Sequence, residues 1–404
     1  MGNISNINSF LLYRDYYKKH AETGILSLIH ATIAPIINIK EALIDMFYAN
    51  CRPILIGSLP LADHEEALRL ILGHTPEIPL WPQLPKKPRE GMIRQFLTGF
   101  PGLIDEGSRY WIETGTPDFE EEMAAFYEDY LRVEADPGYL RNSRFALGMD
   151  SAPGFFTLQN FLKNEQSSHV TAKGQVTGPV TVGIGVKDQH GNSIIYDDNL
   201  RDILIKLLSM KGRWQVAELR QLTGETPPII FIDEPGLVSF GSCGFGGITR
   251  EMACEAVAEV ITAIKQAGGL AGVHICANGD WSPALSSAAD IISFDAYFYF
   301  DNFILYKDQL VEFLARGGIL AWGIVPTSDP LVVARESVDS LFMKWKEQLQ
   351  FLTTFGFSGK QLMEQTFIAP SCGTGSLTDE LAEKVLSMTA ELSHLAKNQL
   401  KAIR

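Results

Sequence analysis

His274 and Cys276 are the residues of this chain whose types and spacing most clearly permit metal chemistry. They stand two positions apart in the stretch AGVHICANGDW, residues 271–281. Side chains at positions i and i+2 of a strand point to the same face, so both could reach one ion if the strand stays extended there. The pair also fits a histidine satisfied inside the core beside a small buried cysteine. The pair alone does not separate these two interpretations.

Segments with the composition of buried strands recur along the chain and alternate with stretches of helical periodicity. Eight strands alternating with helices predict an α/β protein, specifically a (β/α)8 TIM barrel, with a doubly wound open sheet as the alternative. A representative helix is expected over 249–269, with Thr249 at its N-cap and glycines at its end. The expected strands are PILIGS (53–58), LWPQL (80–84), VTAKGQVTG (170–178), IIFIDEP (229–235), AGVHICA (271–277), DIISFDAY (290–297), GILAWGIVP (318–326) and TFIAPSCG (366–373).

The carboxyl ends of all strands of such a barrel meet at one face, where chemistry is placed. Zinc takes thiolate, imidazole and carboxylate ligands in a tetrahedral set, and a catalytic site keeps one position exchangeable. His274, Cys276 and Cys372 supply two sulfurs and one nitrogen, and Asp295 could fill the fourth position. Buried structural cysteines remain the alternative at this point. The residues at the predicted strand ends are Gly57, Ser58, Gln83, Gln175, Thr177, Asp233, Glu234, His274, Cys276, Asp295, Trp322, Gly323 and Cys372.

The rest of the chain is expected to elaborate one domain. Residues 1–50 are predicted to form an N-terminal helical extension, and 51–404 the barrel. A long aromatic and acidic stretch at 100–168 is interpreted as an insertion across the barrel mouth. Cys243, in a glycine-rich stretch after the fourth predicted strand, is expected to be a loop residue rather than a further ligand.

Composition narrows the class of protein. The 404 residues are 46% hydrophobic, carry a formal charge of −14 and include five cysteines. Such acidity argues against nucleic acid and anionic membranes as partners. The odd cysteine count does not make a disulfide framework, and no signal peptide is evident. The longest apolar run near the start, 24–39, is too short to span a bilayer. These features predict a cytoplasmic protein with a substantial core.

Several strand-end motifs together resemble one enzyme family. ILIGSLP, FIDEPGL, VHICANG and PSCG, in this order, are similar to the catalytic half of cobalamin-independent methionine synthase. GQVTGPVT (174–181) and ISFDAY (292–297) resemble the wider superfamily, which includes uroporphyrinogen decarboxylase and the coenzyme M methyltransferases. The resemblance extends from about residue 52 to 376. It implies a zinc-dependent methyltransferase that moves a methyl group to a thiol, most simply homocysteine.

The resemblance also implies roles for individual residues. His274, Cys276 and Cys372 match the zinc ligands of the family. Asp295 falls where methionine synthases have a glutamate ligand. The resemblance therefore implies that Asp295 is a metal ligand and a catalytic residue. Asp233 matches the carboxylate that holds the ammonium group of homocysteine, and it is also expected to be a catalytic residue. The expected substrate-binding residues are Ile56, Gly57, Ser58, Gln175, Asp233 and Glu234.

Two departures from the family bear on the methyl donor. A chain of 404 residues has no room for the second barrel that helps to bind folate in full-length methionine synthases. The proton-donating histidine after the seventh strand is missing, since GIVPTSDP offers Thr327, Ser328 and Asp329. A corrinoid donor needs no such acid. The sequence therefore favours methylcobalamin, or a methylated corrinoid protein as partner, over methyl-folate.

Other functions remain open at the level of sequence. The acceptor could be coenzyme M or another thiol. A metal-free enzyme of the uroporphyrinogen decarboxylase type should carry arginines after the first strand, where this chain has SLPLADHEE. A non-catalytic corrinoid-binding or zinc-binding partner protein, with a structural metal, is the remaining alternative.

Overall fold

The computed structural model of this chain describes residues 47–164, 169–239 and 248–403. Most of the predicted N-terminal extension, up to residue 46, and Cys243 lie outside these ranges. The chain divides into two compact units, Met1–Tyr48 and Ala49–Arg404. The second unit carries all the elements described below.

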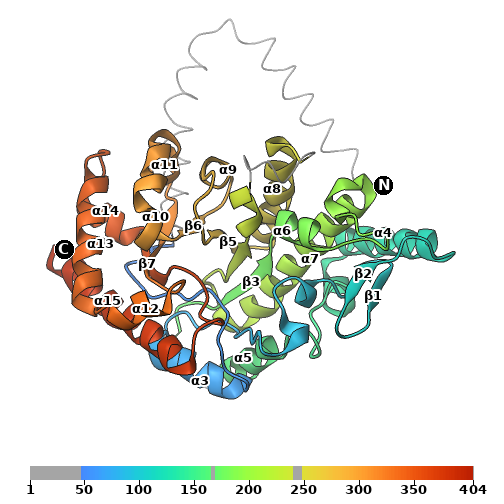
Figure 1. Ribbon diagram of the computed structural model, residues 1–404, viewed down its shortest axis with the longest axis horizontal. Coiled ribbons are helices and arrows are strands. Elements are labelled where there is room, and N and C mark those ends of the chain that lie inside the picture. The colour runs from blue at the N-terminus through green and yellow to red at the C-terminus, as the bar shows by residue number, and fades with distance from the viewer. Residues whose placement is uncertain (1–46, 165–168, 240–247, 404) are drawn as a thin grey trace, which may run out of the picture. The chain divides into compact units, whose positions relative to one another are not determined.

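Six parallel strands form the main sheet, and their spatial order is their order in the chain (Figure 1). Five fall inside a segment predicted as a strand, and β5 begins one residue before its predicted segment, so the α/β class is confirmed together with six of the strands. Their side chains are buried almost throughout, as expected for a parallel sheet with covered faces. The strands are β3 (Lys173–Thr177), β4 (Ile229–Asp233), β5 (Leu270–Ile275), β6 (Ile291–Phe294), β7 (Ile319–Val325) and β8 (Thr366–Pro370).

The predicted strands at 53–58 and 80–84 are wrong as strands. Both segments make isolated parallel bridges instead: Pro53 with Ile368 of β8, Ser58 with Gln83, and Leu80 with Lys173 of β3. Prolines explain much of this, because Pro53, Pro79 and Pro82 have no N–H to donate to a ladder. In the described part of the chain the hydrogen-bonded sheet therefore has six strands and is not closed.

A side chain takes the place of main-chain pairing between β3 and the segment 80–84. The amide of Gln215, buried on α7 (Asp198–Thr223), accepts from the indole N–H of Trp81 (3.0 Å) and from the backbone N–H of Gln175 (3.2 Å). Its NH2 group donates to the carbonyl of Gln175 (2.9 Å). These bonds satisfy buried polar groups of β3 that no neighbouring strand reaches at this position.

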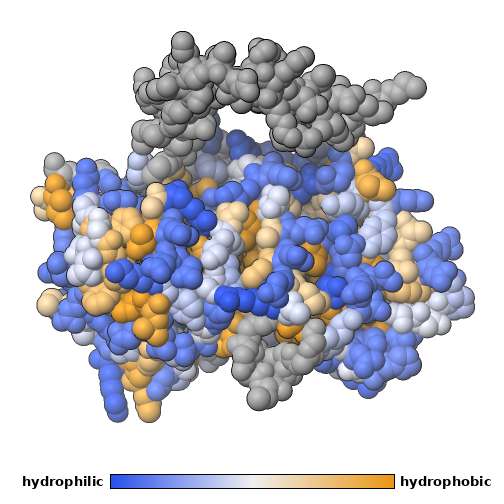
Figure 2. All heavy atoms as spheres, turned by 90° about the horizontal axis from the view of Figure 1, so that it is seen from above, coloured by the Kyte–Doolittle hydropathy of each residue, from blue (hydrophilic) through white to orange (hydrophobic). Residues whose placement is uncertain are grey.

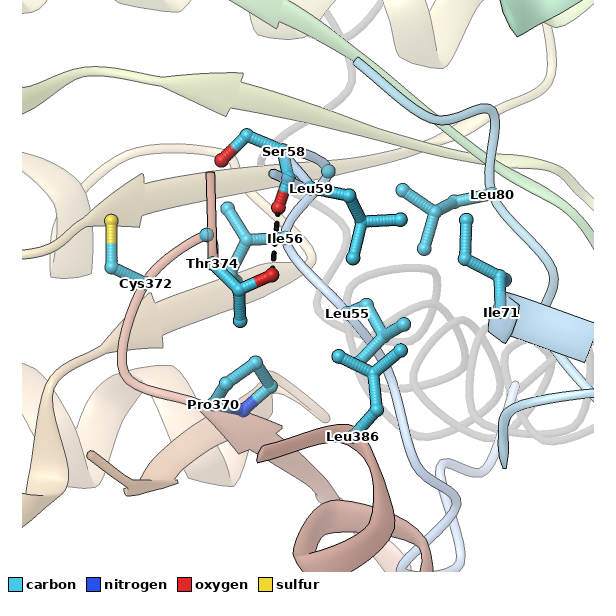
Figure 3. Close-up of a pocket in the computed structure, with 12 residues that line it drawn as sticks. Leu55, Ile56, Ser58, Leu59, Ile71, Leu80, Pro370, Cys372, Thr374 and Leu386 are labelled. Atoms are coloured by element: carbon cyan, nitrogen blue, oxygen red, sulfur yellow. Dashed lines mark hydrogen bonds between the residues drawn. The ribbon is translucent and has the colours of Figure 1, made fainter. Parts of the chain in front are cut away.

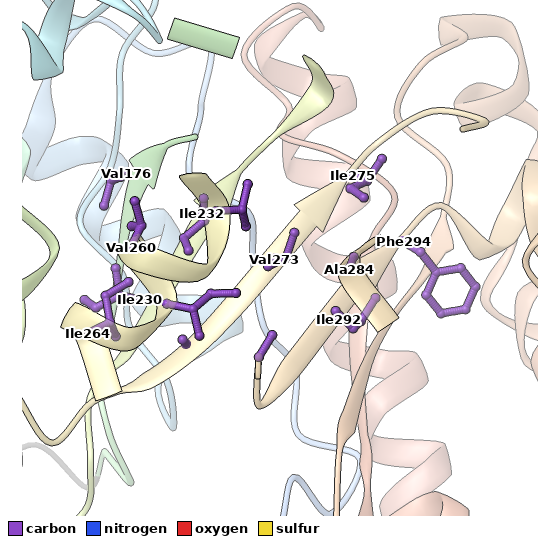
Figure 4. Close-up of a cluster of buried hydrophobic side chains, with 14 of the residues drawn as sticks. Val176, Ile230, Ile232, Val260, Ile264, Val273, Ile275, Ala284, Ile292 and Phe294 are labelled. Atoms are coloured by element: carbon purple, nitrogen blue, oxygen red, sulfur yellow. The ribbon is translucent and has the colours of Figure 1, made fainter. Parts of the chain in front are cut away.

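The two faces of the sheet differ in chemistry because successive side chains alternate. On one face Val176, Ile230, Ile232 and Val273 pack against α8 (Arg250–Gln266) through residues such as Ile264 (Figure 4). The other face carries polar side chains at the intervening positions, listed from β3 to β6 as Lys173, Gln175, Thr177, Asp233, His274 and Ser293. The apolar face supplies the hydrophobic core, and the polar face is where the candidate site is built.

The helices follow the predicted periodicity, with shifted ends. Thr249 is the N-cap of α8, and its hydroxyl accepts from the N–H of Met252 (3.2 Å), as expected. Glu336 and Ser337 separate two other helices, α12 (Pro330–Arg335) and α13 (Val338–Thr353). The remaining helices are α3 (His64–His74), α4 (Phe119–Ala135), α5 (Pro153–Asn164), α6 (Pro179–Gly185), α9 (Ser282–Leu285), α10 (Ala296–Phe303), α11 (Lys307–Ala315), α14 (Gly359–Glu364) and α15 (Asp379–Ile403).

The region 100–168 contains a short antiparallel pair, β1 (Leu103–Asp105) and β2 (Tyr110–Ile112), followed by α4 and α5. Helix α5 packs against α3 and α7. A position of the region across the mouth stays a prediction. On the face in Figure 2, hydrophilic and hydrophobic residues are interspersed. Among the described helices, none combines the length and the apolar character that crossing a membrane requires.

Replacing Gln215 with leucine should destabilise the fold. The change removes three hydrogen bonds and leaves the indole N–H of Trp81 and the N–H of Gln175 buried without acceptors. Each such orphan costs about 1–3 kcal/mol, so the free energy of unfolding should fall by roughly 2–5 kcal/mol. Urea unfolding followed by circular dichroism measures this loss. The matched control is Gln221→Leu on the exposed side of the same helix, which should change stability by less than about 0.5 kcal/mol. Equal effects of the two variants would contradict the role given to Gln215.

Candidate metal centre

The register of the parallel sheet aligns the polar residues of the site in one row. Thr177 pairs with Asp233, Asp233 with His274, and His274 with Ser293 on successive strands from β3 to β6. The row lies at or near the carboxyl ends of the strands. Cys276 follows one residue after β5, and Cys372 two residues after β8. The sheet thus brings together side chains that are up to 195 positions apart in the sequence, from Thr177 to Cys372 (372 − 177).

His274, Cys276 and Cys372 converge as the sequence predicts. A ring nitrogen of His274 and the two Sγ atoms all lie within 4.8 Å of one another. His274 is 2% exposed, and its Nδ1 makes a hydrogen bond of 2.8 Å with the hydroxyl of Ser293. The other nitrogen, Nε2, is buried and has no hydrogen-bond partner within the described part of the chain. An unpartnered buried nitrogen beside two sulfurs has the chemistry of a ligand set.

The two cysteines share a proton. A hydrogen bond from Cys372 lowers the pKa of Cys276 well below its ordinary value, and the nearby His274 acts in the same direction. The same hydrogen bond, with burial, raises the pKa of Cys372 well above its ordinary value. One thiolate, on Cys276, is therefore held by one thiol. A divalent cation would replace that proton and allow both sulfurs to be charged.

The donor set fits zinc by type and by spacing. Zinc binds thiolate at about 2.3 Å and imidazole at about 2.0–2.1 Å, so tetrahedral ligands lie about 3.5–3.8 Å apart. The separations within the triad are compatible with that value after small side-chain adjustments. If all three residues bound one tetrahedral zinc ion, one further position would be left for another ligand.

Asp295 lies beside the triad without joining it. It is the residue after β6 and the N-cap of α10, where its Oδ1 accepts from the N–H of Phe298 (2.9 Å). Its carboxylate is not within the 4.8 Å group formed by the three other residues. Burial raises the pKa of Asp295 to about 6, against the opposing effect of two backbone N–H groups. In this structure the side chain caps a helix, and its role as a ligand stays a prediction.

Asp233 is the carboxylate with free hydrogen-bonding capacity. It is 8% exposed, and its Oδ1 is buried with no partner among the described residues. Burial raises the pKa of Asp233 to about 6, while His274 and Lys173 act to lower it. Lys173 is itself completely buried, with its pKa lowered to about 8 by desolvation, and its ammonium donates to the carbonyl of Ile56. An unsatisfied carboxylate oxygen in this position can accept from a cationic ligand.

Glu234 has a different environment although it is the next residue. Its carboxylate accepts from the N–H groups of Val180 (2.9 Å) and Thr181 (2.7 Å) and from the hydroxyl of Thr181. These bonds tie the end of β4 to the start of α6. Burial raises the pKa of Glu234 to about 7. Both carboxylate oxygens of Glu234 already accept hydrogen bonds, and its role in binding substrate stays a prediction.

The segment 56–58 lies against the loop that carries Cys372. The carbonyl of Ser58 accepts from the N–H (2.9 Å) and the hydroxyl (3.1 Å) of Thr374 (Figure 3). A Cβ atom at Gly373 would collide with the Ser58 hydroxyl, and one at Gly57 would lie 2.8 Å from Oε1 of Gln83. Glycine at 57 therefore leaves room for the side chain of Gln83, and glycine at 373 leaves room for the side chain of Ser58. Ile56, Gly57 and Ser58 are thus placed beside the triad.

Gln175 is completely buried and does not line the cavity beside the triad. Its NH2 group donates to the carbonyl of Trp81 (3.1 Å), and its Oε1 accepts from Lys173 (3.3 Å). Gln175 therefore connects β3 with the segment 80–84 beneath the site.

A cavity of about 210 Å³ opens beside the triad. Part of its wall comes from Pro85, Glu90 and Met92. These residues lie in a proline-rich segment without periodicity, so they could not be predicted as site residues. Glu90 is 2% exposed, and its carboxylate interacts with Nε2 of His64 (2.9 Å) and accepts from the N–H of Leu84 (3.1 Å). The other lining residues are Ile56, Ser58, Gln83, Asp233, Pro235, His274, Cys276, Cys372 and Gly373.

Comparison with known proteins does not extend these observations. No family model matches the chain, and no curated protein matches it in sequence. The fold class and the geometry of the triad therefore carry what can be concluded about this α/β protein.

In the metal-free chain, Cys276 should react with iodoacetamide at pH 6 at least tenfold faster than Cys254. Its lowered pKa makes it a thiolate already at that pH, whereas burial raises the pKa of Cys254 on α8. An ordinary thiol with a pKa near 8.5 is only about 0.3% thiolate at pH 6, which outweighs the lower intrinsic reactivity of a stabilised thiolate.

Peptide mass spectrometry measures both rates in one sample. The Cys276 rate should stay flat from pH 6 to 8, and the Cys254 rate should rise with pH over the same range. Added zinc should protect Cys276 and leave Cys254 unchanged. Equal rates, or no protection, would contradict the description of the triad.

Proposed function

We propose that this protein is a zinc-dependent methyltransferase that moves a methyl group to the sulfur of a small thiol, with homocysteine as the acceptor that fits best. The observation that carries the proposal is the convergence of His274, Cys276 and Cys372 beside a cavity that is also lined by Asp233. The similarity of the strand-end motifs to cobalamin-independent methionine synthase supports the same assignment.

We also propose that the fold is a barrel of the (β/α)8 type, in which the segments 53–58 and 80–84 take the first two strand positions through isolated bridges rather than continuous ladders. Parallel bridges connect Pro53 with β8, Ser58 with Gln83, and Leu80 with β3, which is the neighbour relationship that a barrel requires. Backbone hydrogen bonds from Ile54 to Ile368 (2.9 Å) and from Lys173 to Pro79 (2.9 Å) support it. In such a barrel all the site residues would share the carboxyl-terminal face.

The acceptor side of the cavity suits a small amino-acid thiol. A volume of about 210 Å³ is below the 300–1,000 Å³ typical of pockets for drug-sized ligands, so it suits an acceptor rather than a folate or corrinoid. Asp233 would receive the ammonium group of homocysteine, and the backbone around Gly57 and Ser58 would position the rest of its amino-acid end. Fixing the acceptor in this way lowers the entropic cost of the reaction.

Bound zinc would lower the pKa of the acceptor thiol and hold its sulfur as a nucleophile. His274, Cys276 and Cys372 would hold the ion, and the two thiolates would reduce its net charge so that the acceptor sulfur stays electron-rich. The thiol proton leaves to solvent, the S–C bond forms and the bond between the methyl group and its donor breaks.

The segment that follows β7, residues 326–329, contains no histidine that could act as a proton donor. Thr327, after β7, donates its N–H to the hydroxyl of Ser371 (3.2 Å), and the two hydroxyls are 3.0 Å apart in a buried pair. Hydroxyl groups are weak acids, so the segment after β7 favours a methyl-corrinoid donor, free or carried by a protein, over methyl-folate.

The zinc-loaded chain should transfer methyl from methylcobalamin to homocysteine. Replacing a ligand, as in His274→Ala or Cys276→Ser, should reduce kcat/KM by at least about 100-fold, because an unactivated thiol is mostly protonated at neutral pH. Cys254→Ser is the matched control and should retain full activity. Crossing homocysteine and coenzyme M with methylcobalamin and methyl-folate identifies both substrates by product mass. Zinc bound tightly, with no transfer in any combination and no exchange of a ligand for thiol sulfur, would indicate a structural metal and refute the proposal.

Replacing Asp233 with asparagine should discriminate between acceptors. The KM for homocysteine should rise about tenfold or more, because a charge-assisted contact to its ammonium is lost, whereas the KM for coenzyme M, which has no ammonium, should change little. The pKa of Asp233 near 6 sets the sign of the pH effect. In the wild type, affinity for homocysteine should fall as pH decreases from 7 to 5 and the carboxylate becomes protonated. Kinetics with both acceptors across this range tests the assignment, and a parallel change for both would contradict it.

A further inference from the structure

We infer that Ser293 is a positioning residue for the metal: it fixes the ring of His274 so that Nε2, rather than Nδ1, is the ligand atom. This inference rests on the proposed zinc site. It adds to that site a residue that neither its ligand set nor its cavity includes.

The hydrogen bond between the two residues is set by the sheet. Ser293 is the register partner of His274 on the neighbouring strand β6, and the hydroxyl lies 2.8 Å from Nδ1. Ser293 is 0% and His274 2% exposed, so water does not compete for either group. The main-chain ladder between β5 and β6 holds both Cα positions, and the hydrogen bond then fixes the rotation of the ring.

The bond also occupies Nδ1 and leaves Nε2 as the nitrogen available to a metal. A neutral imidazole carries one proton, and a nitrogen that binds a metal cannot carry it. The serine hydroxyl can accept from Nδ1–H, and in that tautomer, which binding of a metal at Nε2 requires, the lone pair is on Nε2. Nε2 is buried and has no hydrogen-bond partner in the described ranges, and a ring nitrogen of His274 lies within 4.8 Å of both cysteine sulfurs. The ligand is therefore oriented before the metal arrives, which reduces the ordering cost of binding.

Ser293→Ala should weaken zinc binding about 10–100-fold, the loss typical when the residue that orients a histidine ligand is removed. Competition with a chromogenic chelator at fixed pH measures the dissociation constant without any methyl transfer. Ser293→Thr keeps the hydroxyl and should restore the affinity to within about threefold of wild type. Ser209→Ala is the matched control, because Ser209 is a buried serine on α7 whose hydroxyl has no partner among the described residues.

A double-mutant cycle separates orientation from a general loss of stability. In the His274→Ala background, Ser293→Ala should change zinc affinity less than about twofold, because there is no ring left to orient. Substituted cobalt gives an independent readout: in Ser293→Ala the sulfur-to-metal charge-transfer bands should keep their intensity while the ligand-field bands shift.

An unchanged affinity in Ser293→Ala, or an equal loss with and without His274, would overturn the inference. The failure of the two proposals can be distinguished. A wild-type chain that bound no zinc would remove both, whereas tight wild-type binding with an unchanged Ser293→Ala affinity would remove only the role of Ser293.

Discussion

The parallel register from β3 to β6 is the constraint on which the candidate site depends. It aligns Thr177, Asp233, His274 and Ser293 in one row, so a shift of one residue in any strand would turn a polar side chain of this row to the apolar face. The register is itself held by burial, because Val176, Ile230 and similar residues must face α8. The hydrophobic face of the sheet thus determines where the polar residues meet.

The carboxylates near the site show how partners divide similar groups into different roles. Glu234 and Asp295 accept hydrogen bonds from backbone N–H groups in the first turns of α6 and α10. These bonds hold the loops after β4 and β6 in place. Asp233 retains an oxygen without a partner. Burial raises the pKa of all three, and among them a buried oxygen without a hydrogen-bond partner in the described ranges is found on Asp233. The hydrogen-bond partners of these carboxylates, rather than their residue type, indicate which of them have a structural role.

Much of the fold follows from the sequence, because buried parallel strands read as short apolar runs between helices. Six strands, the N-cap at Thr249 and the convergence of His274, Cys276 and Cys372 could be predicted in this way. The strand predictions failed at 53–58 and 80–84, where prolines remove the donors that a ladder needs. Glu90 and Met92 could not be predicted, since a loop without periodicity reaches the cavity through tertiary contacts alone.

The amide of Gln215 connects β3 with the segment 80–84, where main-chain pairing is incomplete. This boundary, together with the segment 53–58, is called the seam here, and it affects which part of the molecule opens locally. Around residues 53–58 and 80–84 the backbone has isolated bridges, while β4 and β5 are paired along their length on both sides. Segments with few ladder bonds open at lower free-energy cost than the central strands. Amide hydrogen exchange should therefore be faster along the seam. The wall of the site formed by Ser58 and Gln83 should then open locally more often than β5, the strand that carries His274.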